Sequence, residues 1–226
     1  MNATPLPDGF GLRPLRADDV PDIFTAIDTQ REHLGRWLPF VAATHRVEQT
    51  REVVAAMLAD PANPVFTLRV RDAFAGLIGF KSADSRTRTV EIGYWLRSEY
   101  QGRGLMTAAA EALCRMAFGQ MGMENVEIKC AAGNLRSNRI PLRLGFRLDR
   151  IEVRGEQLAD GEFTYLNVYR LPRPLNKKPG RRSLPVPTAD TKATLPAQPR
   201  PSPGRDDRQG YPSLIEAISW AGVACR

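Results

Sequence analysis

The sequence predicts one α/β domain in residues 1–172, built on a mixed, mostly antiparallel sheet with helices interspersed. Three observations lead to this prediction. Strand-like and helix-like hydrophobic patterns alternate over this part of the chain, three strand-like runs follow one another with only short turns between them, and strands outnumber helices. Strands joined by short turns pair antiparallel, whereas strands separated by a helix can pair parallel, so the sheet must be mixed.

The N-terminal third is expected to open with a strand and to continue with helices. Residues 10–15 read as a short strand, and Asp18 or Asp19 can cap a helix that runs to Gln30. The stretch HLGRWLPF, residues 33–40, is aromatic and is stopped by a proline. Residues 48–58 then follow a helical period.

The central and C-terminal parts complete the predicted sheet. Three strands at 65–70, 75–81 and 89–96, with turns at 71–74 and 86–87, should form an antiparallel meander. A glycine turn at 102–104 follows, and then a helix at 107–120, a strand at 126–131, a short helix at 137–144, and closing strands at 147–154 and 162–170. Gly145 suits the C-cap of the short helix. In the strand 126–131, Val126, Ile128 and Cys130 share one face.

The remaining residues differ sharply in composition. Residues 173–210 contain eight of the eighteen prolines and nine Lys and Arg against three Asp, with almost no large apolar side chain. Such a segment cannot bury enough apolar area to offset its ordering entropy, so we expect it to be disordered, either as a solvated tail or as a PxxP ligand. Residues 211–226 form a short amphipathic segment that could dock on the domain or on a partner.

Composition excludes several classes of protein. An apolar fraction of 42% and a charged fraction of 25% exclude collagen-like and wholly disordered chains. The three scattered cysteines exclude a disulfide scaffold. Two histidines, without CxxC or HExxH spacing, indicate no metal site. No stretch approaches the roughly 18 apolar residues of a membrane span, and residues 1–15 show no secretory pattern, so we expect a cytoplasmic protein without a membrane partner.

The net charge of +7 is carried almost entirely by residues 173–210, which leaves residues 1–172 nearly neutral. A basic protein would normally suggest nucleic acid as a partner. In this chain we expect nucleic acid to bind only through residues 173–210, the basic tail.

The most informative stretch is EIGYWLRSEYQGRGLMTAAAEAL, which starts at Glu91. A strand runs into a turn with two glycines, and a helix starts at once. This arrangement points several backbone N–H groups and the positive end of the helix dipole at one spot, and it favours a pyrophosphate. The stretch lacks the third glycine of the dinucleotide-binding fingerprint. It also lacks the Gly-Lys-Ser/Thr of the loop that binds nucleoside triphosphates.

The stretch QGRGLM, from Gln101, resembles the Q/R-x-x-G-x-G/A acetyl-CoA motif of the GNAT N-acetyltransferases. HLGRWLPF, the strand EIGYWL, and NLRSNRIPLRLGF from Asn134 are similar, in matching order, to the RimJ/RimL branch that acetylates ribosomal-protein N-termini. The resemblance covers about residues 8–172. It implies the GNAT fold, in which the sheet is split in its middle to admit CoA.

The resemblance also implies a set of site residues. The amides of residues 101–107 would hold the CoA pyrophosphate, residues 94–96 would pair with the pantetheine and supply an oxyanion-stabilising N–H, and Asn134 would bond the pantetheine. Ser137 would protonate the leaving thiolate. The implied cofactor-binding residues are Tyr94, Trp95, Leu96, Gln101, Gly102, Arg103, Gly104, Leu105, Met106, Thr107 and Asn134.

The sequence indicates less clearly which residues bind and deprotonate the acceptor amine. Glu91 is our candidate for holding the water that takes the proton from the amine, and an exposed strand carboxylate is the alternative. His33 and Trp37 would wall the acceptor pocket or simply pack the helices on the sheet. Cys130, on an apolar face, is expected to be core rather than an acyl carrier.

Three positions depart from the family pattern. Met106 stands where Gly or Ala is usual, Pro141 lies inside the short helix, and Tyr165 stands where the branch often has an aspartate. These departures affect the expected acceptor-side geometry more than cofactor binding.

We therefore expect acetyl transfer from acetyl-CoA, without a metal, to a primary amine, foremost a protein N-terminal α-amine. The alternatives are a small amine as acceptor (a polyamine, an aminoglycoside or an amino acid), a non-catalytic acyl-CoA-binding module, and tail-mediated binding to RNA or an anionic surface. The oligomeric state stays open, a homodimer included.

Overall fold

The computed structural model describes residues 4–5, 9–158 and 161–174. The predictions for residues 211–226 and for all but the first two residues of the basic tail lie outside these ranges. In the described part, eight strands form a single sheet in the order β1-β2-β3-β4-β5-β6-β8-β7. The strands are β1 (Thr4–Pro5), β2 (Phe10–Pro14), β3 (Val65–Val70), β4 (Ala73–Asp84), β5 (Thr89–Leu96), β6 (Asn125–Ala131), β7 (Arg147–Gln157) and β8 (Phe163–Pro172).

The antiparallel meander predicted for residues 65–96 is confirmed. β3, β4 and β5 pair in sequence, each antiparallel to the one before it. The turn between β3 and β4 places Arg71 and Asp72 at positive φ, and this left-handed turn reverses the chain within two residues. The one parallel contact among the described strands joins β5 to β6, which are separated in sequence by helix α5 (Leu105–Gly119).

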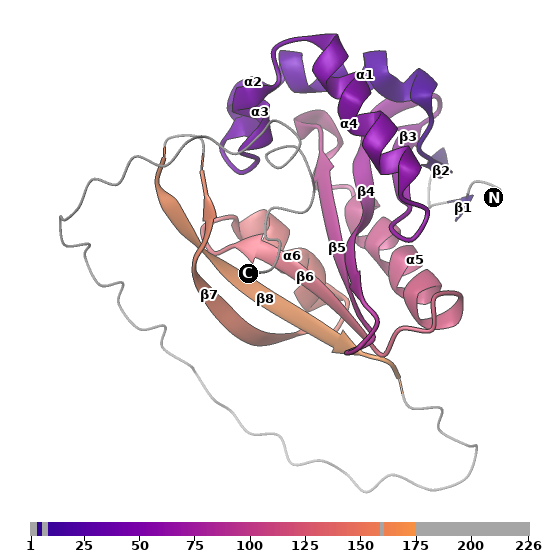
Figure 1. The fold of residues 1–226 in the computed structure, drawn as a ribbon, viewed down its shortest axis with the longest axis vertical. Coiled ribbons are helices and arrows are strands. Elements are labelled where there is room, and N and C mark those ends of the chain that lie inside the picture. Colours follow the sequence, from indigo (N-terminus) through magenta and orange to yellow (C-terminus); the bar gives the residue numbers. More distant parts are fainter. Residues whose placement is uncertain (1–3, 6–8, 159–160, 175–226) are drawn as a thin grey trace, which may run out of the picture. The chain divides into compact units, whose positions relative to one another are not determined.

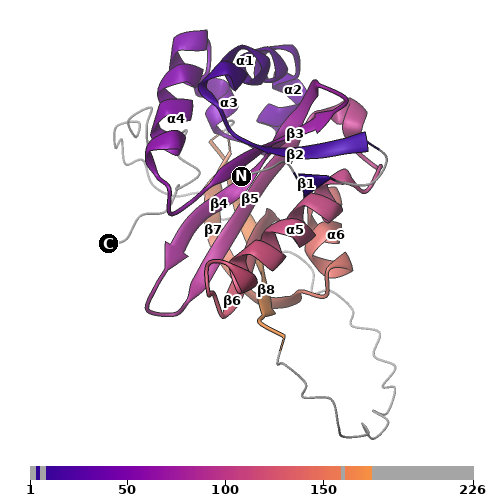
Figure 2. The same cartoon turned by 90° about the vertical axis from the view of Figure 1, so that its right-hand side faces the viewer.

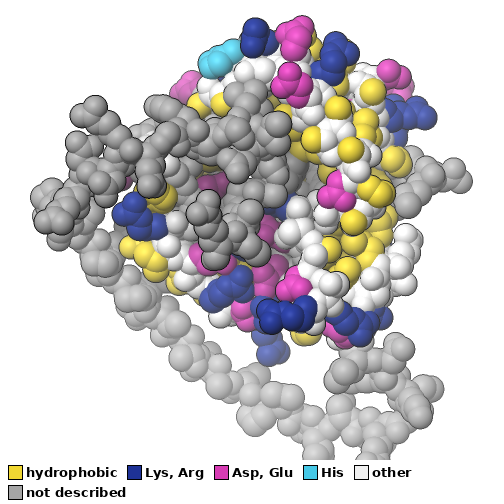
Figure 3. Space-filling view, viewed as in Figure 1, with side chains coloured by type: hydrophobic (Ala, Val, Ile, Leu, Met, Phe, Trp, Pro, Cys, Tyr) yellow, Lys and Arg dark blue, Asp and Glu magenta, His cyan; other side chains and the backbone are white. Residues whose placement is uncertain are grey.

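The helices cover both faces of the sheet (Figures 1 and 2). On one face lie α1 (Val20–Thr29), α2 (Arg31–Gly35), α3 (Phe40–Ala43) and α4 (Val47–Ala59), and the other face carries α5 and α6 (Leu135–Arg143). Each layer has its own apolar core. Leu113 and Ile128 are fully buried in the α5 core, and Ile23 and Trp95 lie in the core under α1. Acidic and basic side chains lie intermixed over the sheet region below α1–α4 (Figure 3).

The sheet is split between β5 and β6. The two strands pair only from Thr89↔Asn125 to Ile92↔Ile128. Beyond this point β5 continues to Leu96 along β4, while β6 continues to Ala131 along β8. The two strands therefore diverge (Figure 1), as the sequence resemblance implied.

Two local features set the geometry at the split. Gly104, with φ +78°, is the N-cap of α5, so the helix begins at Leu105, two residues before its predicted start. Asn134 caps α6, and its side chain accepts a hydrogen bond from the Ser137 N–H. Pro141 lies inside α6, beyond the first turn, where it supplies no N–H to the helix.

Candidate active site

A pocket of about 530 Å³ opens where β5 and β6 diverge, between α2, the glycine turn at residues 101–104, and α6. It brings together most of the residues predicted from the sequence. The predicted residues that line it are His33, Trp37, Tyr94, Trp95, Leu96, Gln101, Gly102, Gly104, Leu105, Met106, Thr107, Asn134 and Ser137. Arg103 and Glu91 are not among its lining residues. Among the described residues, no three His, Cys, Asp or Glu side chains form a group that could hold a metal ion.

The glycine turn and the first turn of α5 provide a site for an anion. Gly102 and Gly104 both have positive φ, a conformation that L side chains rarely adopt. No atom lies within 4 Å of a Cβ built at either glycine, so the space next to the backbone is open. The N–H groups of the first turn of α5 have no helical partner, and the helix dipole favours negative charge there. A pyrophosphate, as found in CoA, fits this end of the pocket.

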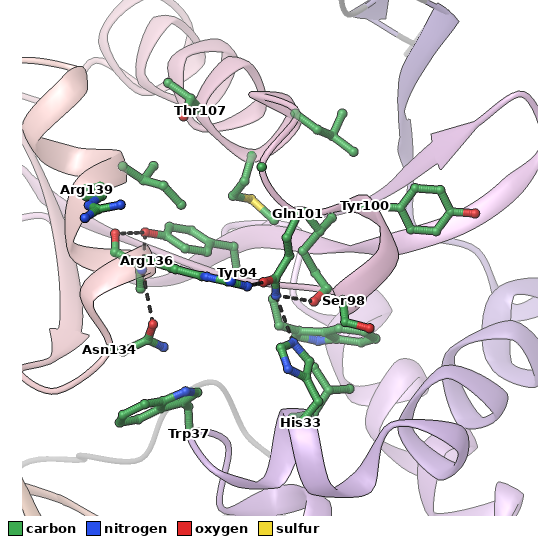
Figure 4. A pocket seen from close by; sticks show the side chains of 18 of the residues that line it. His33, Trp37, Tyr94, Ser98, Tyr100, Gln101, Thr107, Asn134, Arg136 and Arg139 are labelled. Atoms are coloured by element: carbon green, nitrogen blue, oxygen red, sulfur yellow. Dashed lines mark hydrogen bonds between the residues drawn. The ribbon is translucent and has the colours of Figure 1, made fainter.

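Gln101 connects three separate segments of the chain around the pocket (Figure 4). Its Oε1 accepts from Arg136 Nη1 at 2.8 Å, and its Nε2 donates to the Leu96 carbonyl at 3.3 Å and lies 2.8 Å from His33 Nε2. Arg136 can only donate and the carbonyl can only accept, so the orientation of the amide is fixed. His33 Nε2 must therefore accept, which leaves the imidazole proton on Nδ1.

Ser137 lies in a buried polar cluster at the other end of the pocket. Its hydroxyl is 3.3 Å from the Tyr94 hydroxyl and 3.2 Å from Cys130 Sγ. Burial raises the pKa of the Cys130 thiol to about 11, and burial also raises the pKa of Tyr94 well above 10. Both groups are neutral near pH 7. Cys130, with 3% of its surface exposed, is part of the core, as predicted.

Asn134 and Trp37 face each other across the pocket (Figure 4). Asn134 uses its Oδ1 to cap α6, and its Nδ2 makes no hydrogen bond within the described residues, which leaves it available to a ligand. Trp37 packs against the β6–α6 loop, where a Cβ built on Gly133 would lie 3.3 Å from the indole ring. Leu34, the buried residue of α2, packs in the core under α1, whereas His33 and Trp37 border the pocket.

Glu91 lies among charged side chains instead. Its carboxylate forms ion pairs with Lys81 Nζ at 3.0 Å and with Lys129 Nζ at 3.6 Å. It shares a face of β5 with Trp95, four residues later, and it lies one residue before the last pair that joins β5 to β6. Glu91 is thus near the split but is held by two ammonium groups.

A second carboxylate, Glu156, lies near the same charges and was not predicted from the sequence. Burial raises the pKa of Glu156 above its usual 4.5, against the opposing effect of Lys81. Within the described residues its carboxylate makes no hydrogen bond or close ion pair. The register of β7 shifts between Glu152 and Glu156, and Arg154 has a positive φ, so the alternation that places a strand residue on a face fails here. A local sequence signal for Glu156 was therefore lacking.

Comparison with known families resolves what kind of protein carries this site. The model of the acetyltransferase (GNAT) domain matches residues 10–147. The chain belongs to the GNAT acetyltransferases. The resemblance noted in the sequence is thereby confirmed, and so is the split α/β fold of this family.

Two curated relatives and one solved structure agree with membership of the GNAT family. The chain is 30% identical over 139 residues to the Bacillus subtilis protein YdaF, covering 60% of this chain and 76% of that protein. It is 34% identical over 106 residues to the ribosomal-protein-serine acetyltransferase of Escherichia coli, covering 46% of this chain and 58% of that one. The structure of RimL, a ribosomal L7/L12 α-N-protein acetyltransferase in complex with CoA, has the same fold, with a TM-score of 0.72, 22% identity, and coverage of 76% and 98%.

As a GNAT acetyltransferase, the protein is an acetyl-CoA-dependent N-acetyltransferase. Acetyl-CoA supplies the activated acetyl group. The residues at hand fit this cosubstrate, because the open backbone at Gly102 and Gly104 suits its pyrophosphate and the gap beyond Ile92 suits an extended chain. None of the described helices has the length and apolar character that a membrane crossing requires.

Proposed function

We propose that this GNAT enzyme acetylates the N-terminal α-amine of a protein, with direct attack of the amine on the acetyl group. The observation that carries the proposal is the pocket itself, which runs from the glycine turn to Ser137 and is bordered on the acceptor side by His33 and Trp37 of the α2 segment. The names of the Escherichia coli relative and of RimL support a ribosomal protein as the acceptor. Such an acceptor is consistent with the cytoplasmic location expected from the sequence.

Ser137 is proposed as the proton donor to the departing sulfur. Its Oγ lies in the pocket and donates to the hydroxyl of Tyr94 and the thiol of Cys130, two neutral groups, so the serine proton would turn from these acceptors to the departing sulfur. The backbone N–H groups of residues 94–96, where β5 has no β6 partner, are proposed to stabilise negative charge on the acetyl oxygen. The Asn134 amide nitrogen is proposed to hold the pantetheine arm.

Glu156 is a better candidate than Glu91 for the group that takes the amine proton. A general base works best when its pKa lies near the operating pH, and burial moves the pKa of Glu156 in that direction. Glu91 is instead neutralised by Lys81 and Lys129. In this proposal Glu91 orients Lys81 and Lys129, whose charges act on Glu156. Glu156 is not among the residues that line the pocket, so the proposal requires a water to carry the proton from the amine to its carboxylate.

Small amines remain the alternative acceptors, and a non-catalytic CoA-binding module remains the alternative class. Release of free CoA thiol, measured with acetyl-CoA and a panel of N-terminal peptides and small amines, separates them. The Gly104→Trp variant is the control, because a bulky side chain there fills the open space beside the glycine turn. Turnover with peptides alone supports the proposal, turnover with small amines alone contradicts it, and acetyl-CoA binding without any turnover favours the binding module.

A further inference from the structure

The large apolar side chains that stay exposed in the described part of the chain gather in one region. Apart from Leu58 on α4, all of them lie on α6, β7 and β8. They are Leu135, Leu142, Leu148, Ile151, Val153, Phe163 and Tyr165, and we call these seven residues the α6–β7 surface. Their exposed fractions run from 38% for Tyr165 to 68% for Val153. A soluble protein that exposes a group of this size at one place commonly uses it to bind a partner.

The strand residues of the α6–β7 surface lie on the face of the sheet that carries α6. Asn167 and Tyr169 of β8 both donate hydrogen bonds to Oδ1 of Asn138 on α6, so they point to that face. Residues directly opposite each other in an antiparallel pair share a face. Leu148 is opposite Tyr169, and Ile151 is opposite Asn167. Along β8 the alternation from Asn167 brings two further exposed residues to the same face, Tyr165 and Phe163.

The helical residues of the α6–β7 surface face β7. Asn138 connects α6 to β6 and β8, and Ile140 lines the pocket on the β5 side of the helix. At about 3.6 residues per turn, Leu135 and Leu142 lie on one side of α6, and that side is the flank away from the pocket. Since β7 follows β8 in the sheet order, this flank and the exposed face of β7 adjoin.

β7 is also an edge strand. Among the described strands it pairs only with β8, over a length of 11 residues (Figure 1). A long edge strand with apolar side chains associates with other chains unless something covers it. The α6–β7 surface therefore calls for an occupant.

We infer that residues 211–226 of the same chain dock on the α6–β7 surface. This segment, YPSLIEAISWAGVACR, has Glu216 and Arg226 as its charged residues. Its large aliphatic and indole side chains are Leu214, Ile215, Ile218, Trp220 and Val223. Burying them against apolar side chains removes both sets from water, which is favourable.

The length of the connection favours this segment over a second copy of the chain. β8 ends at Pro172, and the far end of the α6–β7 surface, at Phe163, lies about 30 Å back along the strand. The 38 residues from 173 to 210 span about 35 Å on average for a chain without regular structure. A tether that matches the distance to its site gives an effective concentration on the order of 1 mM, without any requirement for a second molecule. The inference rests on the fold and the sequence and is independent of the proposed function.

A spin label on Cys225 of the full-length protein tests the inference. The other two cysteines, Cys114 and Cys130, are buried, and burial raises the pKa of their thiols to about 12 and about 11, so a thiol-reactive label should attach to Cys225. Methyl NMR signals are then compared before and after reduction of the label. The signals of Leu148 and Ile151 should be strongly broadened by the active label, whereas Leu58, exposed on α4, should keep its intensity.

Two variants of the segment provide the matched comparison. Ile218→Asp places a charge where an apolar contact is expected, and it should restore the Leu148 and Ile151 signals. Ser219→Asp adds the same charge at a polar position and should behave as the wild type. Both changes lie outside residues 1–172, so the fold of the domain should be unaffected.

Four outcomes would overturn the inference. Unbroadened Leu148 and Ile151 signals in the wild type would show that the segment does not reach this surface. Broadening that persists in Ile218→Asp would show that apolar contacts do not hold it. Broadening of Leu38, beside the pocket, in place of Leu148 would put the segment over the active site. Equal broadening in a mixture of spin-labelled unenriched protein with unlabelled isotope-enriched protein would show that a second copy supplies the segment.

Discussion

Pro141 lies four residues after Ser137 in α6, and the Ser137 carbonyl accepts a hydrogen bond from the Tyr94 hydroxyl at 3.3 Å. In a regular helix this carbonyl would accept from the N–H of residue 141, which proline lacks. The departure from the family pattern noted in the sequence thus has a structural consequence. Pro141 leaves the carbonyl of Ser137, the proposed proton donor, without its helical N–H partner. The hydroxyl of Tyr94, from β5 on the opposite wall of the pocket, donates to this carbonyl instead.

Replacing Tyr94 with phenylalanine tests this connection. The ring keeps its packing, while Ser137 loses hydrogen bonds at its hydroxyl and its carbonyl. We expect kcat to fall about fivefold, because a hydrogen bond that positions Ser137 is worth about 1 kcal/mol, with the Kd for CoA almost unchanged. Steady-state kinetics together with calorimetry provide the measurement. A raised Kd for CoA at constant kcat would mean that the hydroxyl binds the cosubstrate instead.

The Ser137→Ala variant tests the proton donor itself. Loss of a general acid typically slows a reaction by about 10²-fold or more, and we expect this decrease in kcat with CoA binding preserved. Ser85→Ala, in the exposed turn between β4 and β5, is the matched control and should behave as the wild type. Equal activity of both variants would exclude Ser137 as the donor.

The pH dependence of kcat/KM distinguishes Glu156 from Glu91. Glu156 must be deprotonated to accept a proton, and burial places its pKa above 4.5. The acceptor amine must also be deprotonated, with a pKa of about 8 for an α-amine. The logarithm of kcat/KM should therefore rise with a slope of about two below the pKa of Glu156 and of about one between the two pKa values.

The Glu156→Gln variant should lose about 10² in kcat/KM and show a slope of about one throughout. Glu91→Gln keeps Glu156 and should retain the change of slope. If Glu91→Gln instead loses the change of slope, Glu91 is the residue that holds the proton-accepting water, as predicted from the sequence.

The hydrogen bond between Gln101 and His33 joins the glycine turn to α2. Substitution of His33 by alanine removes this contact but leaves Gln101 bound to Arg136 and to the Leu96 carbonyl. We expect kcat/KM for the acceptor peptide to fall about fivefold, since a lost hydrogen bond is worth about 1 kcal/mol, and the Kd for CoA to change by less than about twofold. An equal effect on both constants would contradict a role for His33 on the acceptor side.

Glu127 is expected to stabilise the sheet in a pH-dependent manner. Burial alone would raise the pKa of Glu127, but hydrogen bonds from Arg150 and Arg170 outweigh burial and hold the pKa below its usual 4.5. A lowered pKa contributes stability above the unfolded-state value of about 4.5, and this contribution is lost as the pH falls through the folded-state pKa.

The Glu127→Gln variant should lose about 2 kcal/mol at pH 7, between the values for exposed and buried pairs, and the difference from the wild type should narrow below about pH 4.5. Chemical denaturation at several pH values measures this difference. Glu124→Gln, which removes an exposed partner of Arg88, should cost less than about 1 kcal/mol. A pH-independent loss in Glu127→Gln would indicate a packing defect rather than a lost charge.

Most of the fold could be predicted from the sequence because hydrophobic periodicity and turn residues are local signals. The meander, the helix after Gly104 and the strand that ends at Ala131 are at or near the predicted positions. The pocket-lining residues that were predicted came from family motifs whose members lie close together in the chain, such as residues 101–107 and the pair Asn134 and Ser137.

The parts that could not be predicted depend on contacts between distant segments. His33 and Gln101 are 68 residues apart, and only the packing of α2 over the split brings them together. Glu156 follows a register shift that no periodic pattern reveals. The ion pairs of Glu91 come from two neighbouring strands, so the sequence alone could not distinguish a free carboxylate from a neutralised one.

The divergence of β5 from β6 couples the stability of the folded chain to the ligand that enters the gap. Within the described residues, Gly93 to Leu96 of β5 pair only with β4, so one edge of this strand is open to an extended ligand. A ligand that binds only the folded state adds about 1.4 kcal/mol of stability for each tenfold rise in its free concentration above Kd. Acetyl-CoA bound in this gap would therefore raise the free energy of local opening of β5 as well as that of global unfolding.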